Sequence, residues 1–354
     1  MSGTSLDGLD IAYCEFKKNK NWKYKIIHAQ TINYNNEWKE KLSAAYIRKP
    51  GNVSDIDNTF GTFIANEVLK FIKRKKIKPD FISSHGHTVF HEPAKGITVQ
   101  IGNGQIISDL CILPVVCDFR TGDVALGGQG APLVPLVDKL LFSEYEYCLN
   151  LGGFANISYD NSRGKRIAFD ICPTNIVLNH LANKLDMEFD KDGGIASNGK
   201  LIPELLDKFN SLSFYKQSYP KSLGREWIEK EFFPILNSSN ISIQNKLRTV
   251  AEHIAIQIAF AVNSKPKAQN QKLFITGGGS YNSFLTERIS AHTKWKVILP
   301  DDRTIQFKEA MAFAFLGVLR MRNEINILKS VTGAKKDSSG GKIYGFPSPW
   351  DKPD

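Results

Sequence analysis

Hydrophobic and polar positions alternate near the start of the chain in a pattern typical of antiparallel strands. Residues 10–16 and 23–34 show this period of two, so the sequence predicts a hairpin there. Two amphipathic stretches follow and predict helices over residues 37–48 and 55–77. Ser54 is the expected N-cap of the second helix, because its hydroxyl can accept a hydrogen bond from a first-turn N–H.

The remaining apolar runs predict alternating strands and helices, which is a mixed α/β pattern. The predicted strands cover residues 81–84, 97–101, 112–119 and 167–171, and the predicted helices cover 131–142, 173–185, 243–262, 284–292 and 309–321. Pro173 suits the first turn of the helix that it would open. Residues 263–271 are polar and predict a linker, and the Ser-, Gly- and Lys-rich residues 335–342 predict a mobile loop.

Three glycine turns interrupt the strands. Residues 3–10 and 151–158 form two short turns of similar design, and residues 277–279 end a third apolar stretch. Glycine lets backbone N–H groups approach a phosphate closely, and small hydroxyls add further donors. Two phosphate hairpins and a third loop for the nucleoside predict an ATP clamp built from two similar domains, and therefore phosphoryl transfer.

Length and composition agree with a globular protein of two domains. The chain has 354 residues, of which 42% are hydrophobic and 23% are charged. No apolar run is long enough to span a bilayer, and the chain does not begin with a basic and then apolar leader. Five scattered cysteines without a C-x-x-C pair predict free, buried thiols and a cytoplasmic protein.

The chain is basic, with a formal net charge of +10. The densest cluster of lysines and arginines, residues 70–78, falls at the end of a predicted helix, where cations complement the helix dipole. A small anionic substrate is an adequate partner for this positive field, so the sequence predicts neither a nucleic-acid partner nor a membrane partner.

Three carboxylates are candidates for chemistry. Asp170 ends a predicted strand beside a helix start, which suits a general base for water, although an N-cap or a structural acid would look alike. Glu309 is read as a substrate-binding residue or as a first-turn acid that complements a helix dipole. Asp7, inside the first glycine turn, is expected to bind Mg²⁺ beside phosphates, unless it only bonds its own turn.

Histidines and one arginine complete the candidates. His85, His87 and His91 could suggest zinc, but no fourth ligand is evident in the sequence. Arg120 ends a predicted strand beside a glycine-rich loop and could hold a carboxylate through two parallel hydrogen bonds. Asp123 and Lys221 are weaker candidates.

Seven segments together resemble the bacterial anhydro-N-acetylmuramic acid kinases. They are MSGTSLDGLD (1–10), SHGHT (84–88), DFRTGDVALGGQGAPLVP (118–135), NLGGFANIS (150–158), KSLGRE (221–226), TGGGSYN (276–282) and SVTGA (330–334). They occur in family order over nearly the whole chain, which makes the set far more specific than any single motif. The resemblance implies the two-domain actin/sugar-kinase/Hsp70-like (ribonuclease H-like) α/β fold, with ATP in the interdomain cleft.

The resemblance also implies an activity. Members of this family hydrolyse the 1,6-anhydro bond of 1,6-anhydro-N-acetylmuramic acid, a recycled peptidoglycan sugar, and phosphorylate its O6 with ATP and Mg²⁺. They are cytoplasmic and usually homodimeric. The implied ATP-binding residues are Gly3, Thr4, Ser5, Leu6, Asp7, Gly8, Leu9, Asp10, Gly152, Gly153, Gly277, Gly278, Gly279 and Asn282.

The implied catalytic base is Asp170, which matches the aspartate of the family's D-T-G-P-G-N segment. This chain has DICPTN at that place, so the aspartate, proline and asparagine are kept while both glycines and the threonine are replaced. The implied sugar-binding residues are His85, His87, Thr88, Arg120, Asn175 and Glu309. His87 stands where the family has glutamine, and Arg120 is expected to hold the lactyl carboxylate of the sugar.

We expect an N-terminal domain over residues 1–119, onto which residues 344–354 pack back, and a C-terminal domain over 120–343. Family members carry about ten residues before the first motif, enough for one more strand. A non-catalytic nucleotide-binding relative that lacks this strand is therefore one alternative. Another is a hydrolase that opens the anhydro sugar without ATP, using Asp170 and Glu309 as its carboxylate pair.

Overall fold

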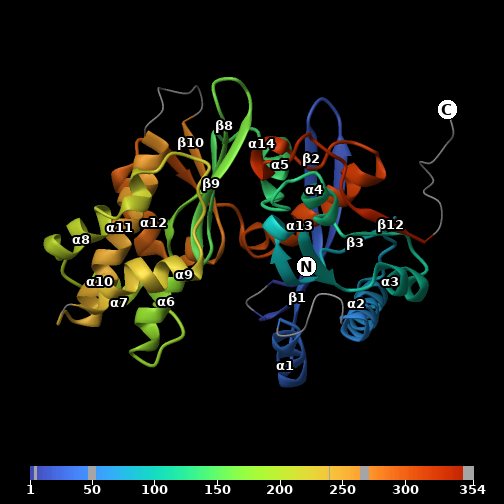
Figure 1. Ribbon diagram of the computed structural model, residues 1–354, viewed down its shortest axis with the longest axis horizontal. Helices are drawn as coiled ribbons and strands as arrows, with labels where there is room; N and C mark the ends of the chain where they lie inside the picture. Colours follow the sequence, from blue (N-terminus) through green and yellow to red (C-terminus); the bar gives the residue numbers. More distant parts are fainter. Residues whose placement is uncertain (4–5, 47–52, 239, 264–270, 346–354) are drawn as a thin grey trace. The chain divides into compact units, whose positions relative to one another are not determined.

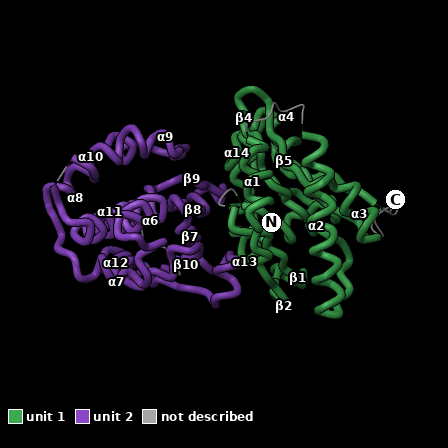
Figure 2. The backbone as a smooth tube through the Cα atoms, turned by 90° about the horizontal axis from the view of Figure 1, so that it is seen from below, with its two compact units in different colours: residues 1–141, 307–354 green, residues 142–306 purple. Residues whose placement is uncertain are grey.

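The computed structural model describes residues 1–3, 6–46, 53–238, 240–263 and 271–345. The chain forms two compact units, shown in Figure 2: unit 1 comprises Met1–Leu141 and Phe307–Asp354, and unit 2 comprises Phe142–Gln306. This division differs from the boundary expected at residue 119/120, because residues 120–141 and the segment after 306 belong to unit 1.

Unit 1 begins with a long antiparallel hairpin, as expected. Strands β1 (Gly8–Lys18) and β2 (Trp22–Asn33) pair along their whole length, with a bulge at Tyr13/Cys14. Phe16 and Trp22 at the far end of the hairpin contact Phe315, with ring centroids 5.2 and 5.0 Å away. Phe315 lies on helix α13 (Asp302–Met321), so these contacts attach the returning chain to unit 1.

Helices α1 (Asn36–Ala45) and α2 (Ser54–Lys75) follow the hairpin. The expected end of the first helix at residue 48 lies outside the described residues. Ser54 is not the N-cap of α2 but its first helical residue, and Val53 occupies the cap position without a side-chain hydrogen bond. The helix begins with acids and ends with bases instead, both of which complement its dipole.

A small sheet and a second hairpin complete the framework of unit 1. The sheet has the order β12 (Lys342–Tyr344), β6 (Val115–Cys117), β3 (Ile82–Ser83), and β4 (His87–Glu92) pairs with β5 (Ile97–Ile101). The helices are η1 (Pro93–Lys95), α3 (Gly104–Cys111), α4 (Thr121–Ala125), α5 (Val134–Leu141) and α14 (Lys329–Thr332).

Two expectations in this unit are wrong. The strand expected over 112–119 is only three residues long, because Ile112 has a φ of 55° and ends helix α3. The loop over 335–342 is held in place rather than loose. Ser338 pairs with Ile327, and the buried Asn326 side chain accepts from the Gly340 N–H at 2.7 Å and donates to the Gly340 carbonyl at 2.8 Å.

Unit 2 is built on a five-stranded mixed sheet covered by helices (Figure 1). Its order is β11 (Lys296–Ile298), β10 (Lys272–Thr276), β7 (Tyr147–Leu151), β8 (Phe154–Asp160), β9 (Arg166–Pro173). The three strands β7, β8 and β9 are antiparallel, whereas β10 runs parallel to β7 and β11. Strand β9 therefore forms one edge of the sheet.

The helices of unit 2 include the long, apolar α11 that the sequence predicted. They are α6 (Asn175–Asn183), η2 (Lys191–Gly193), α7 (Gly194–Ser197), α8 (Pro203–Asn210), η3 (Ser213–Lys216), α9 (Arg225–Trp227), η4 (Ile228–Phe232), α10 (Phe233–Asn237), α11 (Ile243–Asn263), η5 (Gly278–Tyr281) and α12 (Ser283–His292). Pro173 ends β9 instead of opening α6, whose cap position is Thr174. The linker expected over 263–271 lies almost wholly outside the described residues.

The mixed α/β class and the two-unit organisation are confirmed. All five cysteines are free thiols, and all except the half-buried Cys14 are buried. Among the described residues, no helix combines the length and the apolar character that crossing a membrane requires.

Candidate functional site

The first glycine turn connects Ser2 to strand β1. Ser2 and Leu9 form an isolated antiparallel bridge, and the Leu6 N–H donates to the Gly3 carbonyl at 3.4 Å. Asp7 is exposed on this turn. Gly8 is required by packing, since a Cβ there would lie 2.5 Å from the Ile32 carbonyl oxygen. Thr4 and Ser5 lie outside the described residues.

The last two residues of the predicted ATP-binding set make internal contacts. The Leu9 side chain is buried in the core of unit 1. Asp10 accepts a hydrogen bond from the Thr31 hydroxyl at 2.6 Å. Burial raises the pKa of Asp10, and the nearby negative charge of Asp7 raises it further. The Asp7 carboxylate therefore lies close enough for its charge to act on Asp10.

The second turn, Gly152-Gly153, lies between β7 and β8 as expected. Its carbonyl groups face the start of helix α6: the Thr174 N–H donates to the Gly153 oxygen at 2.8 Å, and the Asn175 N–H donates to the Gly152 oxygen at 3.2 Å. The Thr174 hydroxyl adds a third bond, to the Gly152 oxygen at 2.6 Å. Main-chain groups thus provide most of the support of this turn.

The third turn follows β10 and packs against the second. Gly277 has a φ of 87°, and a Cβ there would lie 2.7 Å from the Leu151 oxygen. A Cβ at Gly279 would lie 2.8 Å from the Leu151 Cβ, whereas Gly278 has more space. The Asn175 amide donates to the Leu151 oxygen at 3.3 Å, so it joins the two turns.

Asn282, the last residue of the predicted nucleoside loop, caps a helix. Its side-chain oxygen accepts from the Leu285 N–H at 2.9 Å at the start of α12. The helix therefore fixes the orientation of this asparagine.

Asp170 lies within the edge strand β9, so the alternative of a helix N-cap is excluded. The register shifts at this point, since Asn156 pairs with Asp170 while Ala155 pairs with Cys172. Such a bulge re-aims the neighbouring side chains. One carboxylate oxygen of Asp170 accepts from the Leu223 N–H at 2.9 Å, and the Asp170 N–H donates to the Lys221 carbonyl at 3.2 Å. The segment 221–223 therefore covers the edge of β9.

Burial raises the pKa of Asp170, and the hydrogen bond from Leu223 only partly opposes this. In its ionised form, a carboxylate with a raised pKa is a stronger base than an ordinary aspartate. The Lys221 ammonium donates to the Phe214 carbonyl at 3.3 Å and lies 4.5 Å from the centre of the Phe214 ring. Those contacts direct Lys221 toward η3.

His85 and Arg120 form a buried pair in unit 1. The His85 Nε2 accepts from the Arg120 Nε at 3.1 Å and from its Nη2 at 2.9 Å, while His85 Nδ1 faces the Gly86 carbonyl at 3.1 Å. Burial and the Arg120 charge lower the pKa of His85 well below its ordinary value. The imidazole is therefore neutral, which lets it accept from a guanidinium.

Glu309 lies in the middle of helix α13, not in its first turn, because this helix begins seven residues before the predicted start. Its side chain is exposed. Burial lowers the pKa of Arg120, and the negative charge of Glu309 opposes this effect. Glu309 is thus a neighbour of the His85–Arg120 pair within unit 1.

His87 is not directed toward solvent. Its side chain is 0% exposed, and its ring nitrogens contact the Ser2 hydroxyl at 2.9 Å and the Tyr46 hydroxyl at 3.3 Å. Thr88, the next residue on β4, is half-buried and pairs with Gln100 on β5. Among the residues that the structure describes, no group of three His, Cys, Asp or Glu side chains could hold a metal ion, so the three histidines form no zinc site.

Comparison with known proteins decides the family. The family model described as anhydro-N-acetylmuramic acid kinase matches residues 1–346. The chain belongs to the anhydro-N-acetylmuramic acid kinase family. A relative of that name from Mannheimia succiniciproducens is 34% identical over 97% of both chains, and one from Aliivibrio fischeri is 33% identical over 97% of both. A third, from Sulfurimonas denitrificans, is 32% identical over 97% of this chain and 98% of its own.

The anhydro-N-acetylmuramic acid kinase family is the one that the seven motifs resemble. A solved hexokinase from Schistosoma mansoni in complex with glucose covers 87% of this chain and 84% of its own. It is 11% identical with a TM-score of 0.34, a likeness too distant to bear on fold or function.

One side chain of this family member has a clearer role in the structure than in the sequence. Asp123 is 0% exposed, accepts from the Gly130 N–H at 2.8 Å and accepts from the Thr332 hydroxyl at 2.7 Å. The Gly130 carbonyl in turn accepts from Arg120 at 2.7 Å. Asp123 therefore holds the glycine-rich loop that supports Arg120. Its place in the DFRTGD segment was the only signal for it in the sequence.

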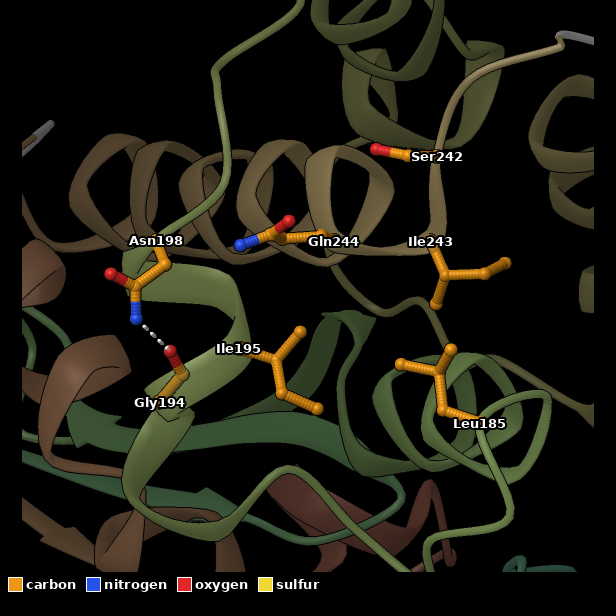
Figure 3. Close-up of a pocket in the computed structure, with 7 residues that line it drawn as sticks. All are labelled: Leu185, Gly194, Ile195, Asn198, Ser242, Ile243 and Gln244. Atoms are coloured by element: carbon orange, nitrogen blue, oxygen red, sulfur yellow. Dashed lines mark hydrogen bonds between the residues drawn. The ribbon is translucent and has the colours of Figure 1, made fainter.

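Each unit of this anhydro-N-acetylmuramic acid kinase family member contains a cavity within its described residues. In unit 1, His85 borders a polar cavity of about 220 Å³, together with Asp57, Gln100, Asp118 and Lys342. In unit 2, an open groove of about 740 Å³ lies between the end of α6, helix α7 and the start of α11. Figure 3 shows its mixed lining, in which Leu185, Ile195 and Ile243 lie beside the polar Asn198, Ser242 and Gln244. None of the predicted site residues is among them.

Proposed function

We propose that this chain is an ATP-dependent kinase that opens 1,6-anhydro-N-acetylmuramic acid and phosphorylates its O6. The product is N-acetylmuramic acid 6-phosphate, an intermediate in peptidoglycan recycling. Family membership over residues 1–346 supports the overall reaction. The observation that carries the proposal is the placement of Asp170, a carboxylate of raised pKa fixed by the Leu223 N–H on a bulged strand.

In this proposal Asp170 removes a proton from a water molecule. The water oxygen bonds to the anomeric carbon C1, and the bond between C1 and O6 breaks. The released O6 attacks the γ-phosphorus of ATP, and the bond to the β-phosphate oxygen breaks to give ADP. Fixing the base beforehand avoids reorganisation during the reaction, and general base catalysis of this kind contributes roughly 10²–10⁴-fold.

The three glycine turns are proposed to bind ATP. The turns at Gly3 and Gly152–Gly153 would present backbone N–H groups to the phosphates, and Gly277–Gly279 with Asn282 would border the nucleoside. The packing of the third turn on Leu151 supports a common role for the two turns of unit 2.

Asp7 is the residue that we propose for Mg²⁺. It is exposed on the first turn, and its charge influences the neighbouring Asp10. In proteins Mg²⁺ is usually bound by one or two carboxylates together with phosphate oxygens. The Asp7 carboxylate beside a phosphate turn therefore fits the ion. When bound, Mg²⁺ neutralises charge on the phosphates.

Arg120 and Glu309, with Thr88 and Asn175, are proposed to bind the sugar, and His85, whose two ring nitrogens are engaged by Arg120 and the Gly86 carbonyl, is proposed to orient Arg120. The Nε and Nη2 side of the Arg120 guanidinium already contacts His85, and one Nη1 proton contacts the Gly130 carbonyl. Since a guanidinium has five N–H donors, two remain for a ligand. These two can bind the lactyl carboxylate, because Arg is well suited to carboxylates.

A cytoplasmic homodimer is the state that we propose for the protein. The free cysteines support a reducing compartment, and the resemblance to the family supports the dimer. Light scattering of the purified protein measures its mass directly, and a monomeric mass across the micromolar range would contradict the dimer.

One assay tests the proposed reaction against its alternatives. The protein is mixed with ATP and 1,6-anhydro-N-acetylmuramic acid, and ADP and sugar phosphate are followed together. We expect equal amounts of both. Ring opening without ATP would instead indicate the hydrolase, and ATP binding without any turnover would indicate the non-catalytic relative.

A further inference from the structure

His87 is enclosed by hydroxyl groups from three separate parts of unit 1. The Tyr34 hydroxyl, just after β2, donates to the Ser2 hydroxyl oxygen at 2.7 Å. The Ser2 hydroxyl contacts His87 Nδ1 at 2.9 Å, and the Tyr46 hydroxyl, at the end of α1, contacts His87 Nε2 at 3.3 Å. The side chains of Tyr34, Ser2 and His87 are all buried.

The direction of these hydrogen bonds follows from the chemistry of the groups. Because Tyr34 donates to the Ser2 oxygen, the Ser2 proton is free to point at His87 Nδ1. Burial lowers the pKa of His87 to about 4, so the ring is neutral near pH 7 and carries one acceptor and one donor nitrogen. Nδ1 then accepts from Ser2, and Nε2–H donates to Tyr46. Both ring nitrogens of His87 are occupied within the protein.

Ser2 is the residue from which the first glycine turn begins. Its bridge to Leu9 closes the turn, and the Gly3 carbonyl accepts from Leu6 inside it. A hydroxyl held by Tyr34 and His87 leaves the Ser2 side chain one orientation, which fixes the direction in which the chain enters Gly3. The His87 side chain thereby connects strand β4 to the start of the first phosphate turn by a hydrogen bond.

We propose that His87 is a positioning residue for the first phosphate turn and sets ATP affinity, rather than a residue that contacts the sugar. The proposal rests on the proposed function, in which this turn binds the phosphates of ATP. It replaces the sugar contact that the sequence suggested for His87, because a buried ring with two bonded nitrogens has no atom to offer a sugar hydroxyl.

The test uses His87→Phe, which keeps a ring of similar shape and removes both hydrogen bonds. We expect the KM for ATP to rise by about 3- to 10-fold, as the loss of one or two buried hydrogen bonds predicts, with kcat and the KM for the sugar within about twofold of wild type. Ser2→Ala should raise the KM for ATP similarly, and the double variant should show less than the product of the two effects. His87→Gln, whose amide can both accept and donate, should restore most of the affinity.

The chain offers a matched control in unit 2. His253 is also 0% exposed, burial lowers its pKa to about 3, and its ring nitrogens contact Asn210 at 2.7 Å and Tyr215 at 2.9 Å. His253→Phe should therefore lower the melting temperature about as much as His87→Phe. It should leave the KM for ATP unchanged, because none of its partners adjoins a glycine turn.

Three results would overturn the proposal. One is a selective rise in the KM for the sugar, which would restore the sugar contact. Another is an equal change for both substrates in the His87 and His253 variants, which would mean a general loss of packing. The third is an unchanged KM for ATP in Ser2→Ala, which removes the hydroxyl and keeps the His87 side chain. If the wild-type protein binds an ATP analogue but shows no turnover, the proposed function fails. The role of His87 is then tested by calorimetric affinities for the analogue in place of KM, so the two failures can be told apart.

Discussion

The two phosphate-turn candidates differ in what holds them. The first turn has main-chain bonds, in which the Asp10 and Tyr34 N–H groups donate to the Met1 and Asp7 carbonyls. It adds side-chain support, since Tyr34 and His87 orient Ser2 from positions far away in the sequence. The second is fixed mainly by main-chain hydrogen bonds from the first residues of α6 to Gly152 and Gly153. Main-chain support survives most substitutions, whereas side-chain support depends on particular residues. We therefore expect side-chain substitutions to disturb the first turn more than the Gly152–Gly153 turn, and we expect unit 2 to be most sensitive at its proposed catalytic carboxylate.

The largest effect is expected in unit 2, from Asp170→Asn. The amide keeps the shape of the carboxylate but cannot take a proton from water, so turnover should fall by roughly 10³-fold while ATP affinity stays nearly constant. Steady-state kinetics with calorimetric ATP binding measure both. Near-normal turnover in the purified variant would remove Asp170 from its proposed role.

Gly277→Ala tests whether the turns of unit 2 tolerate change where the backbone itself is strained. A Cβ would meet the Leu151 oxygen at 2.7 Å, and the φ of 87° disfavours alanine, so ATP affinity should fall about tenfold and the melting temperature should drop. Gly153→Ala is the control for stability, because the nearest atom to its Cβ would be 4.0 Å away. Equal melting temperatures for the two variants would argue against this packing.

Thr174→Val addresses the contrast between the two turns directly. It removes the hydroxyl bond to the Gly152 oxygen but leaves the Thr174 and Asn175 N–H bonds in place. The KM for ATP should rise by less than about threefold, a smaller change than in His87→Phe. If the valine variant loses as much ATP affinity as the His87 variant, the two turns are equally dependent on side chains.

The smallest effect is a pH dependence of stability. The pKa of His87 is about 4 in the folded chain, below its unfolded value, because burial disfavours the charged ring. Between about pH 6.5 and 4 the unfolded state binds a proton that the folded state does not, so stability falls as pH falls through this window. Melting curves over this range should show a shallower pH dependence in His87→Phe. Parallel curves would mean that His87 does not titrate in this way.

Sequence patterns predicted the parts of the molecule that depend on neighbours along the chain. The hairpin of β1 and β2, the glycine turns and the strand that carries Asp170 follow from local periodicity and composition. Helix α13 was predicted too short because its first residues are mostly polar and lack the apolar run that marks its later turns. Glu309 was consequently taken for a first-turn residue.

Features that depend on contacts between residues far apart in the chain could not be predicted from the sequence. The boundary at residue 119/120 missed the contacts of Phe16 and Trp22 with Phe315, which lie almost the whole chain apart. The burial of His87 depends on Ser2 and Tyr34, and no local pattern around a histidine reveals such partners. Motifs located the candidate site residues, but their tertiary surroundings decided which of them face inward.

The split of unit 1 into two stretches of chain has a consequence for biogenesis. Unit 2 is one continuous stretch of chain, so all of its residues leave the ribosome in succession. The hairpin of β1 and β2 is made early, but its packing partner Phe315 on α13 is made near the end of synthesis. We therefore expect unit 2 to fold first during synthesis, while the aromatic end of the N-terminal hairpin stays uncovered and open to chaperones. Pulse-labelled hydrogen exchange during refolding should protect β10 before β1, and the reverse order would contradict this sequence of events.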